Sequence, residues 1–136
     1  MAETLSRFGV TAPEDVLKEF DKHIERDGKS NRSDVLRQLM RRYVSEERWR
    51  EEDGVVYGTV TLMYDHHSPN ISKDLTDLQH DHGNVIICTN HVHISHDACL
   101  ECIVLRGETP KVKFFIDALN RIKGLKSLDT VIASGI

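Results

Sequence analysis

The stretch LSRFGVT, residues 5–11, decides the fold expected for the first half of the chain. From Arg7 onward its polar and apolar side chains alternate, and Phe8 and Val10 stand on the apolar side. This period of two is typical of a half-buried β-strand, because successive side chains of a strand point to opposite faces. The outward positions of the expected strand are Arg7, Gly9 and Thr11.

Two amphipathic helices are expected after this strand. Pro13 stands at the first turn of the first helix, and Gly28 ends it. The second helix begins in the sequence NRSD, where either Asn31 or Ser33 can cap the first turn. Apolar residues recur along this helix at helical spacing, which predicts a buried stripe. The stripe consists of Val35, Leu36, Leu39, Met40 and Tyr43.

One strand and two helices cannot enclose a hydrophobic core alone, because a single strand leaves both of its edges unpaired. Two copies can do so if their strands pair antiparallel across a two-fold axis. Such a module serves either DNA binding or dimerisation alone. Residues 5–48 resemble a ribbon-helix-helix DNA-binding domain, whose two-stranded ribbon enters the major groove. The resemblance implies that Arg7, Gly9 and Thr11 face the bases.

Local positive charge favours the DNA-binding alternative. The whole chain carries a formal charge of −4, but residues 26–42 contain six basic and two acidic side chains. Ser33 lies at a helix N-terminus, where backbone N–H groups can bind a phosphate, and Lys29 and Arg32 flank it. These three residues are expected to anchor the duplex without reading its sequence.

The second half of the chain alternates strands and helices in the order βαββαβ. This order is typical of a ferredoxin-like fold, with both helices on one face of a four-stranded antiparallel sheet. We therefore expect an α+β protein with two domains: a ribbon-helix-helix domain over residues 1–50 and a ferredoxin-like (ACT-like) domain over residues 51–136. The charged stretch 46–54 between them is expected to be a linker or a frayed helix end. The expected elements span about residues 55–64, 68–80, 84–94, 98–106, 110–123 and 125–132.

Length and composition restrict the class of protein. The 136 residues suffice for one domain, or for two small domains that partner subunits complete. No stretch resembles a signal peptide or approaches the roughly 18 apolar residues of a membrane helix. Three cysteines are an odd number, which favours reduced thiols over a disulfide framework. We expect a cytoplasmic protein.

The histidines are concentrated in one region, since seven of the eight lie between residues 66 and 96. In the sequence HVH, His91 and His93 are two residues apart, so on a strand they share a face. Cys99 follows a tight connection and can reach the same end of the sheet, which gives two nitrogens and one sulfur for a metal. Such a set suits nickel, copper or zinc, and the ligand types alone do not decide among them.

The neighbours of Cys99 have different expected roles. Glu101 shares the face of Cys99 and can accept a hydrogen bond from a metal-binding imidazole. Cys102 is three residues from Cys99, so on a strand it points to the opposite face. Cys88 stands among apolar residues and is expected to be buried as a small hydrophobic side chain.

The segments YDHH, QHDHG and HVHISHDACLE, combined with the ribbon-helix-helix half, resemble the nickel-responsive regulator family NikR over essentially the whole chain. The resemblance implies a square-planar Ni(II) site, one per subunit, made by His91, His93 and Cys99 with His80 of a partner. It also implies a homotetramer, a dimer of ribbon dimers, that binds double-stranded operator DNA and represses nickel uptake genes when nickel is bound.

The resemblance implies a further hard-cation site on the second helix, at positions that Asp34 and Gln38 occupy in this chain. Among the other histidines, His66 and His82 are candidates for secondary nickel sites. His67 and His96 are expected to be solvated.

Other functions fit parts of the same pattern. A zinc- or copper-binding regulator has the same ligand types, and a small His/Cys metalloenzyme is a second alternative. The zinc deaminase signature requires H-x-E and P-C-x-x-C, whereas this chain has HVH and ACLEC. A general acid/base is therefore missing, and no enzymatic activity is expected. A ribbon-helix-helix antitoxin, or a regulator whose second half binds an amino acid, does not require the histidine cluster.

Overall fold

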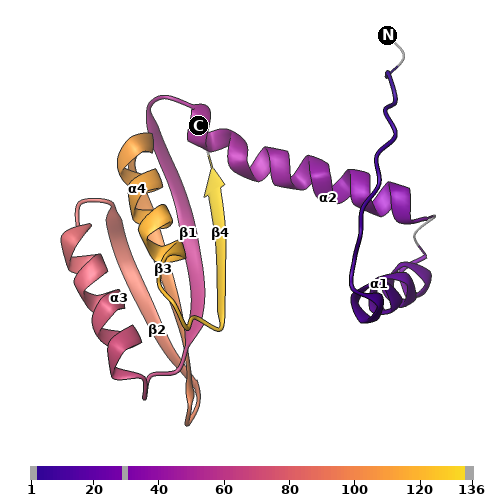
Figure 1. The fold of residues 1–136 in the computed structure, drawn as a ribbon. Coiled ribbons are helices and arrows are strands. Elements are labelled where there is room, and N and C mark those ends of the chain that lie inside the picture. Colours follow the sequence, from indigo (N-terminus) through magenta and orange to yellow (C-terminus); the bar gives the residue numbers. More distant parts are fainter. Residues whose placement is uncertain (1–2, 29–30, 134–136) are drawn as a thin grey trace. The chain divides into compact units, whose positions relative to one another are not determined.

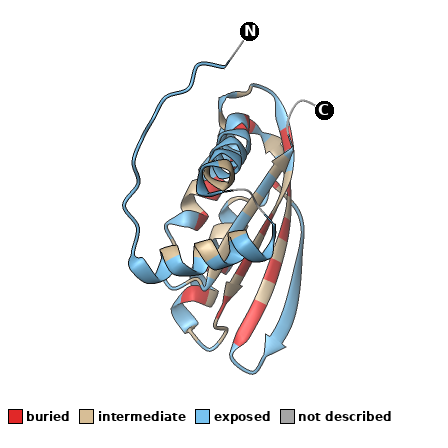
Figure 2. Cartoon of the chain, turned by 90° about the vertical axis from the view of Figure 1, so that its right-hand side faces the viewer, coloured by how far each residue is buried: buried red, intermediate tan, exposed pale blue. Residues whose placement is uncertain are grey.

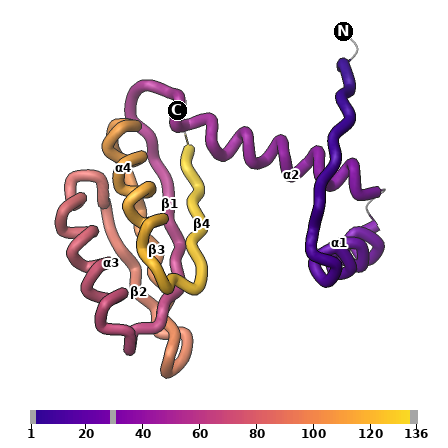
Figure 3. The backbone as a smooth tube through the Cα atoms, in the orientation of Figure 1, coloured from indigo at the N-terminus to yellow at the C-terminus, as the bar shows by residue number. Residues whose placement is uncertain are grey.

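The computed structural model describes residues 3–28 and 31–133, which form two compact units. The first unit ends at Tyr43 and the second begins at Val44. Figure 1 labels the helices and strands, and Figure 3 traces the same path of the backbone. The elements are α1 (Glu14–Arg26), α2 (Arg32–Glu47), η1 (Arg48–Glu51), β1 (Val55–Tyr64), α3 (Pro69–Asp81), β2 (Ile86–Ser95), β3 (Ala98–Glu108), α4 (Thr109–Asn120) and β4 (Ser127–Ala133).

The first unit contains the two expected helices. Gly28 follows α1 with a φ of 65°, a left-handed conformation that glycine adopts without steric cost. The side chain of Asn31 accepts a hydrogen bond from the backbone N–H of Asp34 at 2.9 Å. Of the two possible caps, Asn31 is therefore the one that satisfies the first turn of α2. Arg32 donates two hydrogen bonds to Asp21, at 2.7 and 2.6 Å, and so links α2 to α1.

The strand expected over residues 5–11 does not form in the single chain, because within the described residues this segment pairs with no other strand. The prediction of a buried stripe on α2 is also wrong for the single chain, since Leu39 is 49% exposed and Tyr43 is 67% exposed. Both differences have the same physical reason: a lone strand and one layer of helices have nothing to pack against. The segment and the two helices instead line an open groove of about 790 Å³, with Leu5, Phe8, Val10, Val16, Leu17, Phe20 and Leu36 among its walls.

The second unit confirms the expected βαββαβ order. Its four strands are antiparallel in the order β2-β3-β1-β4, and α3 and α4 lie over the same face of the sheet (Figure 1). Apolar residues of α4 are fully buried against alternate residues of β1 and β3, and Figure 2 shows buried residues along the strands of the sheet. The central core residues are Val60, Leu62, Leu75, Ile103, Leu105, Val112, Phe115, Ile116 and Leu119.

Of the two alternatives expected for the charged stretch 46–54, a linker or a frayed helix end, its first part is the end of a helix. Residues up to Glu47 continue α2, and η1 follows directly. Trp49 is only 3% exposed and belongs to the core of the second unit. Arg50 donates a hydrogen bond to Asp117 of α4 at 2.8 Å, and its guanidinium lies over the Trp49 ring. Because charged residues surround Trp49 in the sequence, its burial could not be predicted.

In the described part of the chain, no helix is both long enough and apolar enough to span a bilayer.

Candidate metal centre

The pairing of β2 with β3 positions the predicted ligands. His93 stands opposite Cys99, and His91 stands opposite Glu101. Residues directly opposite one another in an antiparallel pair point to the same face of the sheet. His91, His93 and Cys99 therefore share the face that α3 and α4 cover, as the sequence predicted.

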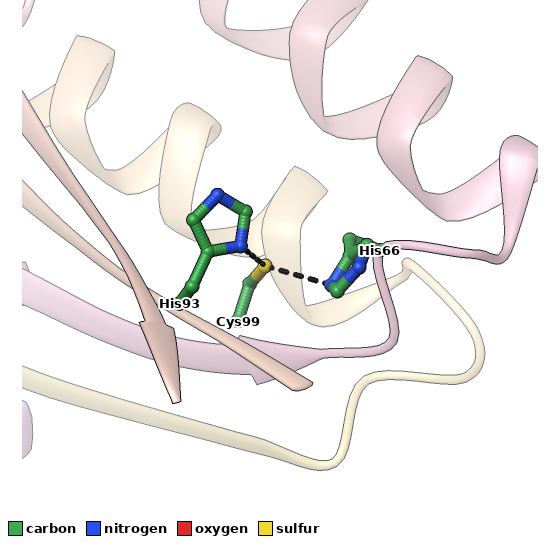
Figure 4. Close-up of side chains that lie close together, drawn as sticks. All are labelled: His66, His93 and Cys99. Carbon is green, nitrogen blue, oxygen red and sulfur yellow. Dashed lines mark hydrogen bonds between the residues drawn. The ribbon is translucent and has the colours of Figure 1, made fainter. Parts of the chain in front are cut away.

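The thiol of Cys99 lies at the centre of a cluster of nitrogen donors. Its side chain is fully buried, and its Sγ is 3.4 Å from Nδ1 of His93 and 3.1 Å from Nδ1 of His66 (Figure 4). His66 comes from the end of β1, where Tyr64 pairs with Cys99. One sulfur and two imidazole nitrogens within this distance fit a borderline or soft divalent metal such as nickel, copper or zinc.

His66 is the ligand candidate that reasoning from spacing did not place beside the thiol. His66 lies in the histidine-rich stretch and in the segment YDHH, but neither signal shows which strand pairs beside it. Partial desolvation lowers the pKa of His66, and the imidazoles of His67 and His93 lower it further. The ring therefore favours its neutral form, which is the form that binds a metal.

His91 faces the same site without touching the sulfur. Its ring centroid is 5.1 Å from that of His93. His91, His93 and His66 all line one cavity of about 520 Å³ beneath α3. His80 is exposed on α3 and belongs to neither of the two histidine clusters in the described residues. The remaining walls of the cavity are Tyr64, Ser72, Leu75, Thr76, Gln79 and Glu101.

Glu101 is a buried carboxylate beside this cavity, with an exposed fraction of 6%. It accepts a hydrogen bond from Nε2 of Gln79 at 2.8 Å, and Oε1 of Gln79 accepts one from Thr89 at 3.1 Å. Burial raises the pKa of Tyr64, and the charge of Glu101 and a hydrogen bond to it raise the pKa further. Glu101 thus holds α3 and β1 together in this structure, whereas the sequence suggested an imidazole as its donor.

The other cysteines lie apart from the cluster. Cys102 points to the opposite face from Cys99, as predicted, and its sulfur lies 3.9 Å from the Thr61 hydroxyl. Cys88 is exposed, so the prediction that it is buried is wrong. A register irregularity between Ile86 and Cys88 shifts the side chains of β2 at this point, and the alternation of the sequence could not reveal it.

His82 is a packing residue in this structure. Its Nδ1 donates to the backbone carbonyl of Leu78 at 2.9 Å. Its ring centroid lies 5.4 Å from that of Phe114 and 5.3 Å from that of Phe115. Within the described residues, His82 belongs to neither group of possible metal ligands.

The residues expected to bind DNA lie in the first unit. Arg7 and Thr11 are exposed, and a side chain at Gly9 would meet nothing within 4 Å. Ser33 is exposed in the first turn of α2, where Arg32 is engaged with Asp21. Lys29 lies outside the described residues.

Two family models match the chain. Residues 57–133 match the model described as the NikR C terminal nickel binding domain, and residues 6–47 match the model of the ribbon-helix-helix protein, copG family. Together these matches cover both units.

Curated relatives match over most of their length. One from Thermococcus kodakarensis is 41% identical over 120 residues, which cover 88% of this chain and 87% of the relative. One from Solibacter usitatus is 43% identical over 122 residues, covering 90% and 88% respectively. A third from Dictyoglomus turgidum is 40% identical over 126 residues, covering 93% of each chain. All three are assigned as nickel-responsive regulators.

Proposed function

The chain belongs to the family of nickel-responsive regulators, and we propose that it represses the genes for nickel uptake when nickel is bound to it. It is a nickel-responsive, DNA-binding regulator and not an enzyme. The observation that supports the metal-sensing role best is the buried thiol of Cys99, whose sulfur lies within 3.4 Å of two imidazole nitrogens.

The proposed nickel ligands are His91, His93 and Cys99 of one chain and His80 of a second chain, with one Ni(II) per chain. Two features support this set. The three ligands from one chain share a face of the sheet, and His91 and His93 line a common cavity. His80 is exposed on the outside of α3 and is accessible to another subunit. The soft thiolate and the imidazoles suit nickel, which the protein would hold without any redox change.

The proposed assembly is a homotetramer of two ribbon dimers. The unpaired segment 5–11 and the exposed apolar residues of α2 support a dimer through the first unit. The uncovered face of the sheet supports contact through the second unit, since Val92 is 51% exposed and Val131 is 67% exposed. Exposed apolar patches of this kind mark interaction surfaces. A protein that binds DNA and nickel in this way would act in the cytoplasm.

Nickel can strengthen DNA binding only if it favours the arrangement of subunits that binds the operator. A ligand contributed by a second chain meets this condition, because the metal then binds the assembled form more tightly than the separate chains. A coupling free energy of ~3 kcal/mol would raise operator affinity more than a hundredfold.

A titration of reduced, metal-free protein with Ni(II) tests this proposal. We expect one equivalent per chain, with a thiolate-to-nickel charge-transfer band, and operator binding that tightens as the band grows. Preferential binding of zinc without an absorption band, or an operator affinity that does not change with nickel, would contradict the proposal. The operator probe is a fragment from upstream of a nickel uptake gene, and a scrambled fragment of equal length is the control.

Arg7→Ala is expected to weaken operator binding by about 1–3 kcal/mol, because Arg7 can donate two hydrogen bonds to a guanine. Binding to the scrambled fragment should change less, since only one positive charge is lost. Electrophoretic mobility shifts at one fixed salt concentration measure both affinities. Lys18→Ala removes an equal charge from α1, where Lys18 pairs with Glu14, and should leave specificity unchanged. A loss of nickel affinity in Arg7→Ala would contradict the separation of the two functions.

A further inference from the structure

The segment that follows α2 is attached to α4 at several points. The ring of Trp49 lies in the same hydrophobic core as the buried residues of α4. Nη1 of Arg50 donates a hydrogen bond to Oδ1 of Asp117 on α4 at 2.8 Å. The backbone carbonyl of Gly54 accepts hydrogen bonds from the backbone N–H of Thr109, at 3.0 Å, and from its hydroxyl, at 3.2 Å. These contacts hold residues 49–54 against α4.

Arg50 connects this segment back to α2. Its Nε lies 2.8 Å from Oε2 of Glu47, the last residue of α2, and within the described residues this buried nitrogen forms an ion pair rather than a directed hydrogen bond. The Cζ atom of Arg50 lies 5.0 Å from the centroid of the Trp49 ring. A planar guanidinium can pair with two carboxylates and stack on an aromatic ring at the same time, whereas an ammonium group cannot. One side chain therefore joins the end of α2 to α4.

The exposure of these groups points to a role in positioning rather than in stability. The side chains of Glu47 and Asp117 are 47% and 36% exposed, and ion pairs with such carboxylates add little to the stability of a fold because water screens them. The geometry is nevertheless specific. The guanidinium of Arg50 reaches both carboxylates only while the last turn of α2 keeps its place beside α4.

We propose that Arg50 is a positioning residue that couples the metal-binding core to α2, an inference that rests on the proposed nickel-responsive function. The metal cavity is lined by Leu75 of α3, which is 1% exposed and shares its core with Phe115 of α4 and with Trp49. Helix α3 also carries the proposed ligand His80. Because a core is close-packed, a shift of α3 on metal binding displaces α4. Arg50 passes this displacement to the last turn of α2, whose earlier turns belong to the DNA-binding unit.

The nickel enhancement of operator binding, which is the ratio of the affinities measured with and without Ni(II), tests this coupling in the full chain. We expect Arg50→Gln to lower the ratio at least fivefold and to leave the thiolate-to-nickel band and its endpoint unchanged, because the substitution keeps every proposed nickel ligand. Arg50→Lys should behave in the same way, since an ammonium group cannot bridge both carboxylates. Arg48→Gln removes an equal charge from an exposed position of η1 and is the matched control, with an unchanged ratio.

A double-mutant cycle tests whether the contact between Arg50 and Asp117 carries the effect. Asp117→Asn should also lower the nickel enhancement, because it removes the acceptor on α4. The variant that combines Arg50→Gln with Asp117→Asn should lower the ratio no further than Arg50→Gln does, since both substitutions break one contact. Losses that add in the combined variant would show that the two side chains act separately and would overturn the proposal.

Hydrogen exchange of the backbone amides of residues 44–52 reports on the attachment itself, without nickel or DNA. Exchange should be faster in Arg50→Gln than in Arg48→Gln, while the amides of β1 and β3 keep their protection and so establish that the variants fold. Unchanged exchange, or an unchanged nickel enhancement, in Arg50→Gln would overturn the proposal. Failure of the proposed function would instead appear in the unaltered protein, as an operator affinity that does not change with nickel. The coupling would then fall with that function, and hydrogen exchange would separately decide whether Arg50 holds the end of α2.

Discussion

Cys99→Ala is expected to abolish the nickel response of DNA binding. The substitution removes the only thiol on the covered face of the sheet among the described residues, and it leaves the imidazoles of His66 and His93 without the sulfur between them. The charge-transfer band should disappear. Operator affinity in the presence of nickel should fall to that of the metal-free protein, more than a hundredfold if the coupling is ~3 kcal/mol. Nickel titration and mobility shifts on the same preparation measure both effects.

Cys88→Ala is the matched control for this experiment. Cys88 lies on β2 of the same hairpin, but it is exposed and belongs to neither group of possible metal ligands in the described residues. The control should keep the band and the nickel response. Persistence of nickel-dependent operator binding in Cys99→Ala would show that the thiol is not a ligand and that the assignment of the site is wrong.

Phe115→Ala is expected to cost about 3–5 kcal/mol of unfolding free energy, because removing a fully buried aromatic ring leaves a cavity. Phe115 is fully buried in α4, against the sheet and beside the ring of His82. Urea unfolding of the full chain measures the loss. The single tryptophan, Trp49, lies in the same core, so its fluorescence reports on the unit that carries the substitution.

Phe114→Ala provides the comparison at the neighbouring position. Phe114 is 61% exposed and also touches His82, so it differs from Phe115 mainly in burial. We expect a cost below about 1 kcal/mol for this substitution, as is usual for exposed positions. A cost for Phe115→Ala that is no larger than that for Phe114→Ala would contradict the described packing of α4.

The fold of the second unit could be predicted from the sequence because its pattern is complete within one chain. The expected order of strands and helices is confirmed, and Pro69 and Pro110 stand in the first turns of α3 and α4. The first unit differs, since in the single chain its expected strand pairs with no other strand and the apolar side of α2 is exposed. Sequence patterns report which surfaces are apolar, and a single chain does not show what covers them.

The candidate site could be predicted only in part. Spacing placed His91 and His93 on one face, because a strand repeats every two residues, and the expected tight connection after them brought Cys99 to the same end of the sheet. The contact of His66 with Cys99 depends on the pairing of β1 with β3, whose strands are separated by more than thirty residues of sequence. Local spacing carries no information about such pairing. The hydrogen bond from Gln79 to Glu101 was hidden for the same reason.

The antiparallel register of β2 and β3 determines how the chain tolerates changes in length. His93 faces Cys99 because the turn after Ser95 returns the chain at Ala98 with the correct offset. A shift of this register by one residue would turn His91 and His93 to the other face, although every side chain would remain present. Substitutions in the turn would leave that offset intact, whereas the insertion or deletion of one residue would erase it. Among related proteins, we therefore expect the length of this turn to vary less than its amino-acid composition.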